Sequence, residues 1–174
     1  MHQQRNVKGR VREQYWPGTL MGFGIFIALG SLFTVVPWTL IDPMHLLRIF
    51  LLLCFIGNLL PYLRSGLWMG MERLEWFLFN LLAIGPLVTS ALLWLNFLVH
   101  GTERTTEHIV LQAHGVNTTL TYEFVDGHLA EFPFARTTYR DWFPITGNAV
   151  RITEADGLFG VAVVVRKEPF VLDH

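Results

Sequence analysis

The residues best suited to chemistry are three histidines in the last third of the chain, His108, His114 and His128. Imidazole nitrogens bind zinc and exchange protons near neutral pH, so the spacing of these residues decides whether such a site exists. His108 and His114 are six residues apart in a segment of strand-like alternation, which separates them by about 20 Å. They cannot share a metal ion without a bend in the strand, and His114 meets His128 only if the first and third strands are neighbours. We therefore predict no metal site and interpret the histidines as exposed residues on the polar face of a sheet.

Other catalytic and cofactor-binding patterns are also missing from the sequence. The serines, Ser31, Ser65 and Ser90, lie in no G-x-S-x-G motif, and there is neither a phosphate-binding loop nor an H-E-x-x-H zinc motif. The single cysteine, Cys54, lies in an apolar run, and we interpret it as a small buried side chain. We therefore predict no catalytic residue and no cofactor.

Long runs without charge indicate the class of protein. Residues 17–41, 49–63 and 76–99 contain no Asp, Glu, Lys or Arg. A helix over the last of these runs is about 36 Å long, which exceeds the roughly 30 Å of a bilayer's hydrocarbon core. We predict three transmembrane helices, with the first over residues 19–41 and the second over residues 46–63. The second is the shortest, and a re-entrant hairpin is the alternative there.

Small and polar residues inside these runs are the candidates for helix packing. Gly18 and Gly22 form a G-x-x-x-G pattern, which allows close approach of helices, and asparagines in a membrane form hydrogen bonds between helices. The full set of predicted packing residues is Gly18, Gly22, Gly30, Asn58, Asn80 and Asn96. We also expect Pro37 to end or kink the first span and the Gly85-Pro86 pair to kink the third.

The distribution of Lys and Arg predicts the orientation. Residues 1–16 contain four of these residues and the 64–75 loop contains two, whereas Arg48 and Arg104 are the two near the opposite ends of the spans. Because basic loops remain in the cytoplasm, we predict that the N-terminus is cytoplasmic and the C-terminal domain lies outside. We expect the protein in the inner membrane of a bacterium, which would place this domain in the periplasm. If the second apolar segment is re-entrant, the C-terminal domain lies in the cytoplasm instead.

From Thr105 the apolar residues alternate with a period of two, which is typical of half-buried strands. In the first predicted strand, Ile109 and Leu111 are on the apolar face and His108 is on the polar face. Asp126-Gly127 and Asp156-Gly157 are hairpin signals. The predicted strands are Glu107–His114, Thr118–Val125, His128–Phe132, Ala149–Ala155 and Leu158–Lys167.

The segment Phe134–Phe143 interrupts this alternation with apolar residues at helical spacing, so we predict a short amphipathic helix there. A β-β-β-α-β-β order indicates an OB-like or similar five-stranded barrel with one short helix. Four residues of the predicted helix are candidates for contact with the membrane surface or a partner, and the alternative is that its aromatic residues plug the barrel. These four are Arg136, Tyr139, Arg140 and Trp142.

The arrangement of spans followed by such a domain resembles the NfeD-type membrane proteins, which carry a C-terminal OB domain. The resemblance covers Glu107–Lys167, and its local pattern is the segment Gly147-Asn148-Ala149-Val150-Arg151-Ile152 before a hairpin. Because a shared fold does not carry function, the resemblance implies the fold of this domain and assigns no role to any residue.

Together these features divide the chain into a basic segment (residues 1–18), a membrane region (19–100) and an extramembrane β domain (101–174). The net charge of −1 argues against a nucleic-acid partner. We expect a non-enzymatic membrane protein that acts as an accessory, scaffold or assembly subunit, in contact with the lipid bilayer and with a protein partner or a second copy. One alternative is a small oligomeric transporter or channel component lined by the asparagines. The other is a membrane-bound enzyme that uses His100, His108 or the Arg136–Asp141 segment.

Overall fold

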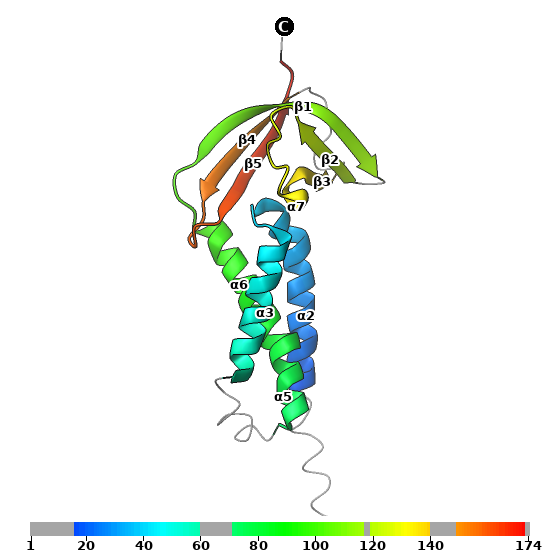
Figure 1. Cartoon of the computed structure of the whole chain (residues 1–174), viewed down its shortest axis with the longest axis vertical. Helices are drawn as coiled ribbons and strands as arrows, with labels where there is room; N and C mark the ends of the chain where they lie inside the picture. The colour runs from blue at the N-terminus through cyan, green and yellow to red at the C-terminus, as the bar shows by residue number, and fades with distance from the viewer. Residues whose placement is uncertain (1–15, 60–70, 117–118, 140–148, 173–174) are drawn as a thin grey trace, which may run out of the picture. The chain divides into compact units, whose positions relative to one another are not determined.

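The structure is a computed structural model that describes residues 16–59, 71–116, 119–139 and 149–172. The chain forms two compact units. The first consists of Met1–Gly30 and Leu47–Ser90, and the second consists of Ser31–Leu46 and Ala91–His174. Figure 1 labels the helices and strands of both units.

Two helical segments are long and apolar enough to cross a membrane, Trp16–Trp38 and Arg73–Leu98. The first contains helix α2 (Trp16–Thr34) and the 3-10 turn η1 (Val36–Trp38). The second contains α5 (Arg73–Phe79), the π-helical turn η2 (Asn80–Ile84) and α6 (Gly85–Leu98). A shorter apolar helix, α3 (Pro43–Leu59), lies between them in the sequence.

The irregular turns occur where proline predicts them. Helix α2 ends at Thr34 and the chain tightens into η1 around Pro37, because proline disfavours helical conformation in the preceding residue. The π-helical turn η2 comes directly before the Gly85-Pro86 pair. Pro86 has no N–H to donate to the carbonyl of Leu82, and a wider turn accommodates the missing bond.

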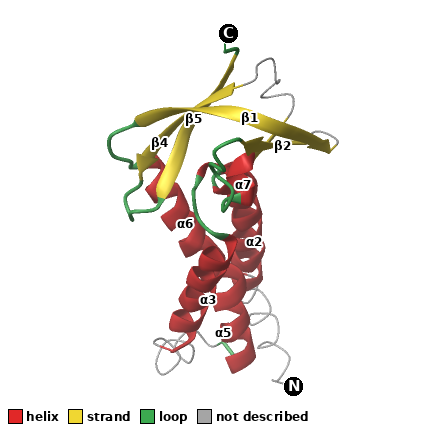
Figure 2. Cartoon of the chain, turned by 45° about the horizontal axis from the view of Figure 1, so that its top comes forward, coloured by secondary structure: helices red, strands yellow, loops and turns green. Residues whose placement is uncertain are grey.

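The sheet of the second unit is antiparallel, with the strand order β3-β2-β1-β4-β5. The first half of β1 pairs with β4 and its second half pairs with β2, and a register shift between Val110 and Gln112 separates the two halves. Such a bulge bends a strand, so the sheet curls into a half-barrel, with two arms on either side of β1 (Figure 2). The strands are β1 (Arg104–Val116), β2 (Thr119–Phe124), β3 (Thr137–Tyr139), β4 (Ala149–Asp156) and β5 (Ala162–Phe170).

The prediction of a third strand over His128–Phe132 is wrong, because this segment forms a series of turns. The side chain of Asp126 accepts a hydrogen bond from the backbone N–H of His128 at 3.0 Å, which closes a local turn. Gly127 and Leu129 then adopt positive φ angles of 72° and 59°. A strand cannot continue through such residues, so the chain turns back under the sheet.

The prediction of a helix over Phe134–Phe143 is wrong in its extent. Only α7 (Pro133–Arg136) is helical, and the chain then enters β3, where Thr121 of β2 pairs with Thr137. The short helix therefore precedes the third strand of the sheet instead of following it. Threonines favour a strand because their branched side chains fit its pleated surface, and pairing with β2 overrides the helical spacing. Residues 140–143 lie outside the described part of the chain.

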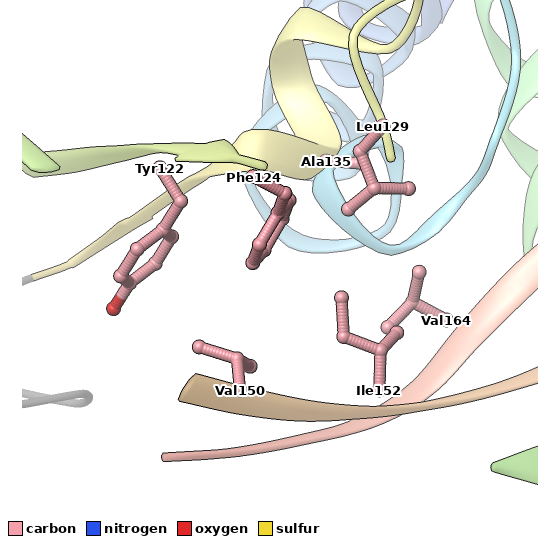
Figure 3. Packing of buried hydrophobic residues seen from close by; sticks show 7 residues of the cluster. All are labelled: Tyr122, Phe124, Leu129, Ala135, Val150, Ile152 and Val164. Carbon is pink, nitrogen blue, oxygen red and sulfur yellow. The ribbon is translucent and has the colours of Figure 1, made fainter. Parts of the chain in front are cut away.

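The core of the half-barrel gathers on the concave face of the sheet (Figure 3). Trp38 and Leu40, which follow helix α2, are partly buried against it together with Val110 and Phe132. The chain that leaves the first apolar helix therefore contributes to the core of the β domain. The buried cluster consists of Tyr122, Phe124, Leu129, Ala135, Val150, Ile152 and Val164.

The predicted faces of β1 are reversed in the structure. His108 is 7% exposed and Val110 packs against the core, whereas Ile109 and Leu111 are 51% and 66% exposed. Alternation alone cannot reveal this reversal, because it shows that two faces exist and the tertiary fold decides which one is covered. The prediction that His108 is exposed is therefore wrong.

Candidate functional site

The β4–β5 hairpin (Asp156–Val163) is held by the side chain of a helical asparagine. Asn96 of α6 donates from Nδ2 to the carbonyl oxygen of Val161 at 2.9 Å, and its Oδ1 accepts from the backbone N–H of Phe159 at 2.9 Å. Asn96 is 3% exposed. Both ends of the amide are thus used by a hairpin more than sixty residues away, and the predicted helix-packing residue fastens a helix to the sheet.

The same hairpin forms backbone contacts with the chain just after each long apolar segment. The backbone N–H of Gly101 donates to the backbone carbonyl oxygen of Asp156 at 2.8 Å. The neighbouring residue His100 forms an isolated β-bridge with Gly157. After the first segment, the backbone N–H of Leu40 donates to the backbone carbonyl oxygen of Ala162 at 2.8 Å. We call the contacts of Thr39, Leu40, Asn96, His100 and Gly101 with this hairpin the hairpin clamp.

Glycine is required at position 157 by the hairpin clamp. A Cβ atom on Gly157 would overlap the side-chain amide of Asn96, so only glycine allows this approach. The sequence-based prediction used Gly157 as a turn residue alone. The structure adds the reason for its position, which is the space that Asn96 occupies.

A second polar contact joins the two long helices near their C-terminal ends. Trp94 donates from its indole N–H to the hydroxyl of Ser31 at 3.3 Å, and Ser31 is 4% exposed. Residues 31 and 94 precede Trp38 and Leu98, the last residues of the two segments, by seven and four positions. The C-terminal ends of both segments therefore lie at one hairpin.

The β domain also contains a stacked pair of histidines that the sequence-based prediction missed. The rings of His108 and His128 lie parallel within 5°, with centroids 3.8 Å apart. Nδ1 of His108 is 2.6 Å from Oδ2 of Asp126, and Nε2 of His128 is 2.8 Å from Oε1 of Glu154. Each imidazole therefore has its own carboxylate partner. The pair therefore connects three elements, which are β1, β4 and the turn that follows β2.

The environment of this pair favours the ionised form of Asp126. Burial raises the pKa of its carboxyl group, but hydrogen bonds from His108 and from the backbone of His128 outweigh that effect, so the pKa lies below its ordinary value. The hydroxyl of Thr106 is 2.7 Å from Nε2 of His108. A hydroxyl, an imidazole and a carboxylate in series also occur where a base activates a nucleophile. Here the three residues connect the turn after β2 to strand β1, and we interpret them as a structural hydrogen-bond network of the half-barrel.

No group of three His, Cys, Asp or Glu side chains within residues 16–59, 71–116, 119–139 and 149–172 is arranged to hold a metal ion. The histidine pair could offer two ring nitrogens to a metal ion. However, Asp126 is hydrogen-bonded to one ring of the pair and Glu154 to the other.

Lys167 of β5 extends its ammonium group beneath the half-barrel. Its Nζ donates to the carbonyl oxygen of Ala135 at 2.5 Å and lies 5.0 Å from the ring centroid of Trp38. Burial lowers the pKa of Lys167 from 10.5 to about 8. The carbonyl and the aromatic face both attract a cation, so this lysine connects the end of α7 with the chain that follows α2.

The predicted packing glycines have open space where a side chain would begin. A Cβ atom on Gly18, Gly22 or Gly30 would meet nothing within 4 Å. The close approaches of the first unit occur instead at Gly24, against the backbone of Leu82 and Ala83, and at Gly85, against the sulfur of Cys54. The packing role of Gly18, Gly22 and Gly30 stays a prediction.

The other two asparagines differ from Asn96. Asn80 is completely buried, and its Nδ2 donates to the carbonyl of Trp76 in the same helix at 2.9 Å. Its Oδ1 has no hydrogen-bond partner among the described residues. Asn58 lies in α3, but its side chain is outside the part of the structure that is described. Neither residue is seen to bridge two helices.

The four predicted surface residues are only partly described. Arg136 ends α7 and is half-buried, and Tyr139 lies in β3 opposite Thr119, with its side chain outside the described part. Arg140 and Trp142 also lie outside the described residues. Their predicted contact with a membrane surface or a partner stays a prediction.

Comparison with known proteins leaves the function to be argued from the chain itself. No family model, curated protein or solved structure matches it.

Proposed function

We propose that this chain is an integral membrane protein that acts by binding, as an accessory, scaffold or assembly subunit, and presents its half-barrel in a fixed position at the membrane face. The observation that carries the proposal is the hairpin clamp, which attaches one hairpin of the sheet to the chain at the ends of both long apolar segments. A flexible linker would let the domain move freely, whereas these contacts hold it. A fixed orientation suits a surface that a partner must find beside the bilayer.

The hairpin clamp also supports a third crossing. If both long segments span the bilayer, their C-terminal ends lie at the same membrane face, because both meet one hairpin. The chain between them must then return across the membrane, and α3 is the described helix in that interval. Its 17 residues extend about 26 Å, so a few further residues complete a span. A re-entrant hairpin would leave the two ends at opposite faces.

Three crossings and the basic N-terminal segment favour a cytoplasmic N-terminus and a half-barrel outside, in the periplasm of a bacterium. We also propose that the half-barrel is OB-like. The asparagine-lined pore is a poorer alternative, because the amide of Asn96 already has both partners in the hairpin.

Reporter fusions test the topology of this proposal. A periplasmic reporter fused after His174 should be active, and a cytoplasmic reporter at the same position should be inactive. Fusions within residues 64–75 should give the opposite result. A C-terminal reporter that is active only in the cytoplasm would contradict the three-span arrangement.

The mass of the particle in mild detergent tests the binding role. We expect the purified chain to form a complex of defined stoichiometry, either with a partner or with a second copy, when it is extracted from its native membrane. A chain that resists carbonate extraction but is strictly monomeric, with no partner after chemical crosslinking in the membrane, would argue against an assembly role.

A further inference from the structure

The tip of the β4–β5 hairpin carries large apolar side chains where a water-facing turn would have polar ones. Leu158 and Phe159 are each 52% exposed. Residues 157–165 form an uninterrupted stretch without charge, with Asp156 before it and Arg166 after it. Turns that face water are usually rich in polar residues, and neighbouring exposed apolar side chains mark a surface that binds something.

The position of this tip indicates what it binds. Because Asn96 holds Phe159 and Val161, the turn lies beside the last helical turn of α6, about 3 Å along the helix axis before its end at Leu98. The helix end itself exposes apolar side chains, with Leu98 65% and Val99 49% exposed. Exposed apolar side chains therefore occur both on the turn and at the end of the helix beside it, and that helix belongs to a segment long enough to span a bilayer.

The backbone of the turn is suited to a medium that contains little water. The N–H of Gly157 donates to the carbonyl oxygen of Val161, and the N–H of Gly160 donates to the carbonyl oxygen of Gly157. The N–H of Phe159 donates to the side-chain oxygen of Asn96. Unpaired peptide groups are costly where lipid replaces water, and only paired backbone is tolerated there. The buried asparagine near the end of an apolar helix thus has a physical reason, because it satisfies one peptide N–H and one peptide carbonyl of the turn.

From these observations we propose that the turn Gly157–Val161 inserts into the boundary between lipid headgroups and acyl chains, with Leu158 and Phe159 in contact with lipid. The proposal rests on the proposed function, in which α6 spans the membrane. The half-barrel then has two kinds of attachment to the bilayer, the covalent connection through α6 and a second contact through the hairpin. The two contacts fix its tilt relative to the membrane plane.

The test uses the full chain in lipid nanodiscs, with Cys54 replaced by alanine and one new cysteine in each variant, labelled with a small fluorophore. Leu158→Cys reports on the turn, and Leu111→Cys is the matched control, because Leu111 is also an exposed leucine of the β domain, on the outward face of β1. Val88→Cys reports on a position near the middle of the Arg73–Leu98 segment. Each label is quenched by nitroxide-bearing lipid in one experiment and by aqueous iodide in another.

We expect the label at position 158 to be quenched several-fold more by nitroxide lipid than the label at 111, and several-fold less by iodide. Phe159→Cys should repeat the result, so a local defect in one variant does not decide the outcome. Equal iodide quenching at 158 and 111 would overturn the proposal, and so would protection of position 158 from both quenchers, which would indicate contact with protein. If Val88→Cys is not quenched by nitroxide lipid, the proposed function itself fails.

Discussion

Replacing Asn96 with alanine tests the hairpin clamp most directly. The substitution removes two hydrogen bonds at 2.9 Å, one to the N–H of Phe159 and one to the carbonyl of Val161. A protein hydrogen bond contributes about 0.5–1.5 kcal/mol net, so the pair should contribute about 2 kcal/mol to holding the hairpin. A loss of about 2 kcal/mol corresponds to roughly a 30-fold larger population of the open hairpin.

Hydrogen exchange of the intact chain measures this population. Peptides that cover residues 156–165 should exchange about 30-fold faster in Asn96→Ala than in the wild type, because local opening controls amide exchange. Peptides from β1 and β2 should change much less, since their pairing does not involve Asn96. Circular dichroism confirms that the variant keeps its sheet.

The matched control is Asn80→Ala, which removes the same side chain from the same long apolar segment. Among the described residues Asn80 donates within its own helix and is seen to make no contact with the hairpin, so exchange at residues 156–165 should remain as in the wild type. If Asn96→Ala also leaves this exchange unchanged, the two hydrogen bonds do not hold the hairpin, and the argument for a fixed half-barrel is refuted.

Three further predictions concern the same domain. Gly157→Ala should accelerate exchange of the hairpin as Asn96→Ala does, and the two effects should be less than additive in the double variant, because both act on one contact. The pKa of Lys167 is about 8 in the folded chain and 10.5 in the unfolded chain, so the unfolded chain binds more protons between these pH values. The free energy of unfolding should therefore rise from pH 8 to pH 10.5, by up to about 3 kcal/mol. A rise that persists in Lys167→Met would contradict this assignment. Val110→Ser should lower the free energy of unfolding by about 1–3 kcal/mol, and Leu111→Ser should lower it by less than about 0.5 kcal/mol. Denaturant titration measures both values, and the reverse ranking would show that the other face of β1 is buried.

Local features of the sequence predicted the elements whose cause is itself local. The charge-free runs account for the two long apolar segments, and the prolines account for the irregular turns near Pro37 and Pro86. The alternating segments correspond to the long strands β1, β2, β4 and β5, and the Asp156-Gly157 pair lies at the predicted hairpin. Each of these depends on a few neighbouring residues, which a sequence displays directly.

The errors occur where two signals compete or where a distant segment decides. Alternation around His108 was correct as a period but wrong in its face, because the carboxylate of Asp126 compensates the burial of the imidazole. The helical spacing of Phe134–Phe143 was overridden at Thr137 by pairing with β2. No local pattern reveals a partner that lies in another strand.

The sequence by itself determined that the chain has long apolar helices followed by an antiparallel β domain, because hydrophobic runs and alternation are properties of adjacent residues. The tertiary structure alone decided that Asn96 contacts the hairpin, that His108 stacks on His128, and that the C-terminal ends of both long helical segments meet the same hairpin. These facts depend on contacts between residues that are 20 to more than 100 positions apart. Such contacts form only when the whole domain folds, and the periodicity of a single segment contains no information about them.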